Sequence, residues 1–240
     1  MKTDFYNKFV KAKQFTDQYG EIYGTEDFAI YLYSVIKMLK PKIVVELGTG
    51  LGTTMLWAAL ALEENQQGKI ITVDDGSEWP RINSVVNLNH NYSNHINSLI
   101  QQFDLQCVDF RNERIQTLDI ENPIDILFCD YAHSVYDVCH LLAEYLPLMN
   151  SYSKIYIDSA STHYNSYNAL EQIIKLFNQD CIPKTIKELA STDLEPIVKN
   201  HKFDLEHVIE NKNRNQNSTA CITVSPVDIF PYPRVNIRSV

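Results

Sequence analysis

Three of the seven glycines of this 240-residue chain lie within five positions, at Gly48, Gly50 and Gly52. They follow the apolar run Lys42–Leu47, which predicts a buried strand, and they precede a helical pattern that starts at Thr53. Glycine is favoured where the backbone must turn sharply or approach a ligand closely. A glycine cluster between a strand and a helix therefore predicts a ligand-binding turn in an α/β fold.

The rest of the chain alternates short apolar runs with helical stretches, a pattern typical of a parallel sheet covered by helices. We expect further strands at 69–74, 107–109, 124–130, 154–158, 203–208 and 220–224. We expect helices at 26–38, 53–64, 135–146 and 167–177, and in the second half of 80–103. The predicted fold is a doubly wound, mostly parallel seven-stranded sheet with an antiparallel final strand and an N-terminal helical extension.

No internal repeat or linker divides the chain, so we predict a single domain over residues 1–240. Within it we expect an N-terminal helical extension (1–40), a core that carries the glycine cluster (41–225) and a tail (226–240). The asparagine-rich composition of residues 210–218 predicts an exposed hairpin loop between the last two strands.

The charge balance and the apolar pattern exclude several classes of protein. The formal net charge is −9, without a basic run, which argues against nucleic acid or an anionic membrane as the main partner. No run of about 18 apolar residues is present, and the first residues lack a signal-peptide core, so we expect a cytoplasmic protein. None of the five cysteines forms a CxxC pair, so neither a disulfide framework nor a cysteine metal site is predicted.

The glycine cluster differs from the two common phosphate-binding loops. The dinucleotide pattern GxGxxG would need a third glycine where Thr53 stands, and a P-loop would need a Gly-Lys-Ser/Thr ending. Glu46 would also repel the phosphates of a dinucleotide. These departures disfavour a nicotinamide-dependent oxidoreductase.

The segment Glu46-x-Gly48-x-Gly50-x-Gly52 instead resembles the first motif of class I S-adenosylmethionine-dependent methyltransferases. Other family landmarks match in order: an acidic residue ends or follows the second, third and fourth strands, as Asp74, Asp109 and Asp130 do. The resemblance implies S-adenosylmethionine as the cofactor, a suitable ligand for carboxylates because its net charge is positive. It implies cofactor contacts at Glu46, Gly48, Thr49, Gly50, Gly52, Asp74, Asp109, Phe110 and Asp130.

The end of the fourth strand points to a subgroup. Phe128–Ser134 resembles the Phe-Ile-Asp-Gly-Asp-His-Ser segment of a group that includes small-molecule O-methyltransferases of natural-product pathways. Ala132 replaces the second aspartate of that segment. In metal-dependent relatives, acidic residues after strands four and five hold a divalent cation, which would fall to Asp130 and Asp158 here. Two aspartates are a weak magnesium site, so a functional metal is not favoured.

Methyl transfer requires alignment and removal of a proton from the acceptor. We predict His133 as the base, because a neutral imidazole can accept a proton, with Asp130 beside the methyl donor. His163 is the second candidate base.

The predicted function is methyl transfer from S-adenosylmethionine to a small molecule, with oxygen as the favoured acceptor. The alternatives are an N-methyltransferase acting on a small molecule or peptide-like substrate, and a catalytically silent cofactor-binding protein. A small-molecule substrate is the expected partner, and a homodimer is left open.

Overall fold

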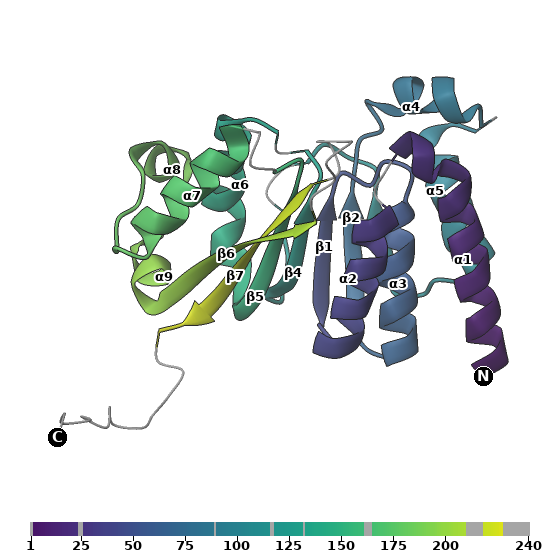
Figure 1. The fold of residues 1–240 in the computed structure, drawn as a ribbon, viewed down its shortest axis with the longest axis horizontal. Coiled ribbons are helices and arrows are strands. Elements are labelled where there is room, and N and C mark those ends of the chain that lie inside the picture. Colours follow the sequence, from purple (N-terminus) through teal and green to yellow (C-terminus); the bar gives the residue numbers. More distant parts are fainter. Residues whose placement is uncertain are drawn as a thin grey trace.

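Figure 1 presents the chain as a computed structural model. The structure describes residues 2–23, 26–88, 90–115, 118–131, 133–160, 165–209 and 218–227. Within these ranges, no helix has both the length and the apolar character needed to cross a membrane.

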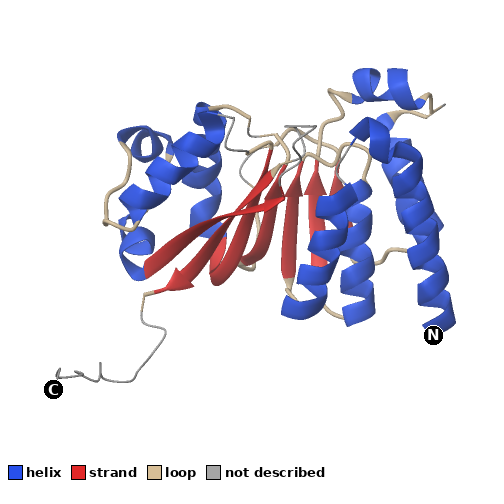
Figure 2. Cartoon of the chain, in the orientation of Figure 1, coloured by secondary structure: helices blue, strands red, loops and turns tan. Residues whose placement is uncertain are grey.

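In the described part of the chain, seven strands form one sheet in the order β3-β2-β1-β4-β5-β7-β6 (Figure 2). The strands are β1 (Ile43–Leu47), β2 (Lys69–Val73), β3 (Val108–Arg111), β4 (Ile124–Cys129), β5 (Met149–Asp158), β6 (His201–Ile209) and β7 (Thr219–Pro226). Strands β1 to β5 pair in parallel, whereas β7 is antiparallel to both β5 and β6. The predicted mostly parallel sheet with an antiparallel final strand is confirmed.

The helices cover both faces of the sheet. They are α1 (Lys2–Tyr23), α2 (Glu26–Leu39), α3 (Thr53–Asn65), α4 (Trp79–Val86), α5 (Tyr92–Phe103), α6 (Val135–Tyr145), the 3-10 turn η1 (Leu146–Leu148), α7 (Asn165–Phe177), α8 (Lys184–Leu189) and α9 (Glu195–Asn200). One apolar core joins the sheet to α1 through α5, and the other joins it to α6, α7, α8 and α9. The fold is therefore doubly wound, as predicted.

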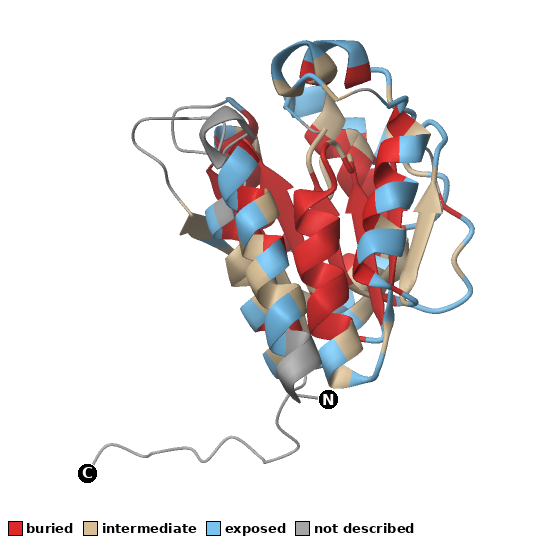
Figure 3. Cartoon of the chain, turned by 90° about the vertical axis from the view of Figure 1, so that its right-hand side faces the viewer, coloured by how far each residue is buried: buried red, intermediate tan, exposed pale blue. Residues whose placement is uncertain are grey.

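Helix α3, which follows the glycine cluster, is buried along most of its length (Figure 3). Every residue from Thr53 to Leu62 is buried, because α3 lies between the sheet and the helices α1 and α2. The indole nitrogen of Trp57 donates a hydrogen bond of 2.9 Å to Thr16 Oγ1 in α1. The predicted N-terminal helical extension is thus packed into the core rather than appended to it.

The structure differs from the sequence-based prediction in several local details. Residues 80–103 hold two helices rather than one, because Asn87 ends α4 in a left-handed conformation and Asn91 caps α5. Strand β5 begins earlier than predicted, at Met149, with a register shift against β4. The short helices α8 and α9 were not predicted, since neither carries a long apolar period.

Some predictions fall outside the described residues. These are the loop at 210–217, most of the tail (228–240), Ala132 and His163. The single-domain organisation stays a prediction.

Candidate active site

The candidate site lies where the strand order changes direction at the centre of the sheet. From β1 the chain moves to β2 on one side, and β4 lies on the other side of β1. In open α/β sheets, ligands bind at the carboxyl ends of the strands at such a switch point. Gly48 and Asp130 meet there, since a Cβ atom on Gly48 would stand 3.4 Å from the backbone and Cβ of Asp130.

The glycine loop requires backbone conformations that side chains resist. Gly48, Gly50 and Gly52 have φ angles of +96°, +53° and +81°, in or near the left-handed region. Gly52 donates a hydrogen bond of 2.8 Å to Thr49 O, which closes the turn, and it begins helix α3. A Cβ at Gly52 would also approach Ile96 to 3.1 Å, so α5 packs directly on the loop.

Asp74 joins the glycine loop to the loop after β2. Its Oδ2 accepts a hydrogen bond from the Gly50 amide at 2.9 Å, and its Oδ1 accepts one from the Gly76 amide at 2.7 Å. The side chain of Asn112 donates to Asp74 O at 2.9 Å. Each carboxylate oxygen can accept a second hydrogen bond. The half-buried Asp74 can therefore hold the loop and still receive hydroxyl groups of a ligand.

Glu46 lies beneath the loop rather than on it. The side chain is 1 % exposed, and its Oε2 accepts a hydrogen bond from Thr72, whose hydroxyl also contacts that of Thr49. No described residue hydrogen-bonds to Oε1. Burial raises the pKa of Glu46 to about 8, with a smaller contribution from the charge of Asp74. Glu46 is thus mostly protonated in the free protein, and the charge that repels a dinucleotide is weaker than the sequence alone implies.

The structure brings Asp130 and Asp158 together at the ends of β4 and β5. Burial, followed by the charge of Asp158, raises the pKa of Asp130 well above its ordinary value. Burial also raises the pKa of Asp158, which is 5 % exposed, although it accepts hydrogen bonds from the hydroxyls of Ser159 and Thr219. Burial and mutual repulsion thus both oppose two negative charges on this pair.

His133 lies three residues after Asp130, on the segment that leads into α6. The imidazole is exposed and lies close enough to Asp158 to lower the pKa of that carboxyl through its charge. Ser134 begins α6 with a capping box, in which its hydroxyl accepts from the Asp137 amide at 3.1 Å. This cap fixes the position at which α6 begins. It therefore also fixes the position of the exposed His133, the residue just before the cap.

Few protein ligands for magnesium lie close together in the described part of the chain. The described residues contain no group of three or more His, Cys, Asp or Glu side chains that could hold a metal ion. Magnesium requires about six oxygen ligands, and the Asp158 carboxyl already accepts hydrogen bonds from Ser159 and Thr219.

The third strand differs in detail from the family landmark. Asp109 lies inside β3 rather than after it, and its carboxylate accepts hydrogen bonds from the Arg111 guanidinium, the closer at 3.1 Å. Phe110 points to the opposite face and packs edge-on against Tyr92 at 5.9 Å between ring centroids. The prediction that the third strand ends at Asp109 is therefore wrong, because the strand extends to Arg111.

Sequence reasoning missed two residues that shape the site. Tyr92 buries its ring against Gly76, where any Cβ would approach the ring to 2.4 Å, so this position of the loop after β2 requires glycine. Asn112, the residue after β3, donates a side-chain hydrogen bond to the same loop at Asp74 O. The Asp-Asp-Gly run at 74–76 is the sequence signal that marks a tight turn here.

The central part of the chain matches a known family. Residues 45–160 match the family model described as "Methyltransferase domain". This match agrees with the methyltransferase resemblance drawn from the glycine cluster. A search of curated protein sequences found no significant match.

Solved structures share the fold at low sequence identity. A methyltransferase from Geobacter sulfurreducens is 14% identical, with a TM-score of 0.56, and the match covers 91% of this chain and 88% of that one. The O-methyltransferase TomG from Streptomyces achromogenes, involved in tomaymycin synthesis and solved with S-adenosylmethionine, is 14% identical, with a TM-score of 0.50 and coverages of 83% and 80%. The Podospora anserina methyltransferase PaMTH1, solved with S-adenosylhomocysteine, is 11% identical, with a TM-score of 0.50 and coverages of 91% and 86%.

The raised pKa of Glu46 predicts a pH-dependent stability in the cofactor-free protein. Between about pH 5 and pH 8 the folded state keeps a proton that the unfolded state releases, so the free energy of unfolding falls as pH rises. The slope is at most about 1.4 kcal/mol per pH unit from this one group. Glu46→Gln cannot titrate, so its stability relative to wild type should increase with pH in urea unfolding experiments.

Glu64→Gln provides the matched control, because the pKa of Glu64 is lowered rather than raised. Its stability relative to wild type should not increase with pH over the same range. A pH-independent difference between wild type and Glu46→Gln would refute the buried, protonated state of Glu46.

Proposed function

We propose that the chain transfers a methyl group from S-adenosylmethionine to an oxygen atom of a small molecule. The observation that carries this proposal is the glycine loop after β1, bound to the Asp74 carboxylate through the Gly50 amide at 2.9 Å. The methyltransferase-domain match over residues 45–160 supports it. TomG, an O-methyltransferase of similar fold, supports oxygen as the acceptor.

The residues at the switch point fit the chemistry of this cofactor. Asp74 has free acceptor positions for the two ribose hydroxyls. The backbone of the Gly48–Gly52 loop lies at the carboxyl end of β1, where a ligand can approach it closely. A cationic ligand would favour the ionised forms of the acidic side chains Glu46, Asp130 and Asp158 at this edge. Thr49, Asp109 and Phe110 complete the proposed cofactor contacts.

When bound, S-adenosylmethionine supplies an activated methyl group. The protein then has two tasks, which are to align the acceptor and to remove the acceptor's proton. His133 stands at the open edge and can accept that proton. The Asp158 carboxyl lies close enough to interact with the positive charge that His133 would then carry. Asp130, packed against Gly48, positions the methyl donor.

The acceptor is proposed as a small hydroxylated molecule, of the kind that natural-product pathways modify. This proposal draws on the segment Phe128–Ser134 and on the fold shared with TomG. Screening a panel of hydroxylated aromatic compounds with radiolabelled cofactor would identify a usable acceptor for the measurements below.

Removing the Asp74 carboxylate should weaken cofactor binding. Losing a charged hydrogen-bond partner costs roughly 1.5–3 kcal/mol, or about ten- to a hundredfold in affinity. Isothermal titration calorimetry with S-adenosylmethionine should therefore show this loss for Asp74→Ala. Asp75→Ala is the matched control, because the Asp75 carboxylate is exposed and accepts from Ser77 instead, and it should bind like wild type. Unchanged affinity in a folded Asp74→Ala variant would exclude Asp74 from the cofactor site.

Removing the His133 imidazole should slow the reaction without affecting cofactor binding. General-base catalysis typically contributes about 10²–10⁴ in rate, so kcat of His133→Ala should fall by about that factor. His140→Ala removes a half-buried imidazole further along α6 and should retain wild-type kcat. A His133→Ala variant with wild-type turnover would remove this residue from the mechanism.

Methyl transfer should persist after divalent cations are removed. Of the two carboxyls that could bind magnesium, that of Asp158 already accepts hydrogen bonds from two protein hydroxyls, and Ala132 stands where the related segment has aspartate. Turnover measured after dialysis against a chelator should match the untreated enzyme. Loss of activity that added magnesium restores would show that the reaction needs the metal.

A further inference from the structure

Helix α5 contacts the glycine loop at two consecutive residues. A Cβ atom on Gly52 would approach the side chains of Ile96 and Leu99, each to 3.1 Å. His95, on the same helix, reaches the preceding residue of the loop, because its Nε2 lies 3.1 Å from Leu51 O. Helix α5 therefore holds the loop through a hydrogen bond as well as through apolar contacts.

The contact with Leu51 identifies the proton-bearing nitrogen of the His95 ring. A backbone carbonyl oxygen can only accept a hydrogen bond, so Nε2 must carry the hydrogen. Both residues are buried, with exposed fractions of 5% for His95 and 2% for Leu51. Burial lowers the pKa of His95, and the hydrogen bond to Leu51 raises it to a smaller extent. The fold thus favours a neutral ring with its proton on Nε2.

Two aromatic rings hold the His95 ring in its orientation. It stacks on Trp79 of α4, with 5.1 Å between ring centroids, and on Phe15 of α1, with 6.4 Å, and the interplanar angle is 25° in both pairs. Trp79 is held in turn, because its indole nitrogen donates to His90 O at 3.1 Å. Figure 1 shows α1, α4 and α5 together at one end of the sheet. The stacked ring has little freedom to turn its Nε2–H away from Leu51.

The peptide between Leu51 and Gly52 is held at both of its polar groups. Its carbonyl accepts from His95, and its amide donates to Thr49 O at 2.8 Å. Because a peptide group is planar, these two hydrogen bonds together fix its orientation. Gly52 has a φ of +81°, a conformation that glycine adopts readily but does not prefer over others. Hydrogen bonds from outside the loop are therefore needed to keep it in one shape.

We propose that His95 is a positioning residue of the cofactor site, whose Nε2–H holds the Leu51–Gly52 peptide in the orientation that binds S-adenosylmethionine. His95 acts through the loop and does not touch the reacting atoms. The proposal rests on the proposed binding of the cofactor by the Gly48–Gly52 loop. A loop that the protein no longer holds in place must be ordered by the ligand, at a cost in affinity.

Two substitutions separate the hydrogen bond of His95 from its packing. His95→Phe keeps an aromatic ring and removes the donor, whereas His95→Gln loses the ring and keeps an N–H at the end of the side chain. Isothermal titration calorimetry with S-adenosylmethionine should show binding about tenfold weaker for His95→Phe and within about threefold of wild type for His95→Gln. If His95 contributed packing alone, His95→Gln would be the weaker binder, and that order would overturn the proposal.

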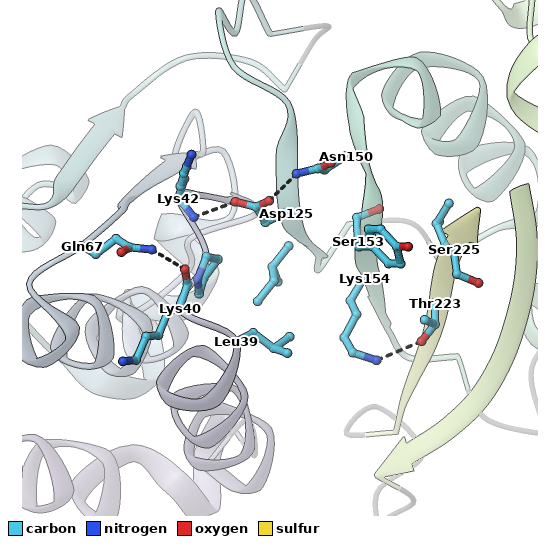
Figure 4. A pocket seen from close by; sticks show the side chains of 14 residues that line it. Leu39, Lys40, Lys42, Gln67, Asp125, Asn150, Ser153, Lys154, Thr223 and Ser225 are labelled. Atoms are coloured by element: carbon cyan, nitrogen blue, oxygen red, sulfur yellow. Dashed lines mark hydrogen bonds between the residues drawn. The ribbon is translucent and has the colours of Figure 1, made fainter. Parts of the chain in front are cut away.

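Two hydrogen bonds remote from the loop provide matched controls. Nδ1 of His201 lies 2.8 Å from Ile197 O, so His201→Phe removes a second histidine–carbonyl hydrogen bond. Lys154 donates to Thr223 Oγ1 at 2.9 Å, beside a cavity of about 390 Å³ that reaches the amino ends of β1 and β4 (Figure 4), and Thr223→Val removes this bond. Both variants should bind the cofactor like wild type. A loss in either control as large as that of His95→Phe would contradict a specific role for His95.

A measurement on the wild-type chain keeps the proposal testable if His95→Phe does not fold. Nuclear magnetic resonance of the full chain, with ¹⁵N-labelled histidine, distinguishes ring nitrogens that carry a proton from those that do not, and comparison with His95→Gln identifies the His95 signals. Nε2 of His95 should carry the proton, and its signal should shift when S-adenosylmethionine is added, whereas the His201 signals should not. A proton on Nδ1 alone, or no shift at saturating cofactor, would refute the proposal.

The outcomes separate this proposal from the cofactor assignment on which it rests. If wild type binds S-adenosylmethionine and a folded His95→Phe variant binds it equally well, only the role of His95 is wrong. If wild type does not bind S-adenosylmethionine, the cofactor assignment fails, and the role of His95 fails with it.

Discussion

The carboxylate of Asp74 holds two loops of the candidate active site, at the carboxyl ends of β1 and β2, in one arrangement. One oxygen accepts the amide of Gly50 after β1, and the other accepts the amide of Gly76 after β2. Hydrogen bonds to a charged group contribute about 1.5–3 kcal/mol each, so this one side chain can fix both loops. Helix α5 packs on the glycine loop at Gly52, and the Asn112 side chain donates a hydrogen bond to Asp74 O, so both add to the contacts around this arrangement.

The same edge concentrates acidic groups at a cost that a cationic ligand would reduce. Burial raises the pKa values of Glu46, Asp130 and Asp158, so these carboxyls hold a proton more readily than exposed carboxyls do. A positively charged cofactor would favour the ionised carboxyls. Cofactor binding and the protonation of these carboxyls should therefore be linked. The carboxyls at this edge would be ionised to a greater extent when a cationic ligand is bound than in the free protein.

Much of the fold follows directly from the sequence. Apolar runs such as Ile43–Leu47 give the buried parallel strands, and the cluster Gly48–Gly52 marks the turn that binds a ligand. The strand ends placed Asp74, Asp130 and Asp158 at one edge. Contacts between distant segments could not be predicted from the sequence pattern. The ring of Tyr92, for example, contacts Gly76 only because the tertiary fold brings the two segments together. The protonation of Glu46 was likewise hidden, since burial rather than residue type sets its pKa.

The location of the cofactor is the central claim, and photo-crosslinking tests it most directly. Ultraviolet irradiation of the protein with S-adenosylmethionine labelled on its methyl group, followed by peptide mapping, reports which residues lie against the ligand. The account predicts label in the peptides that contain Gly48–Gly52 and Asp74–Tyr92, and loss of that label when unlabelled S-adenosylhomocysteine is present in excess. Label confined to other peptides, or no competable label on the folded protein, would contradict it.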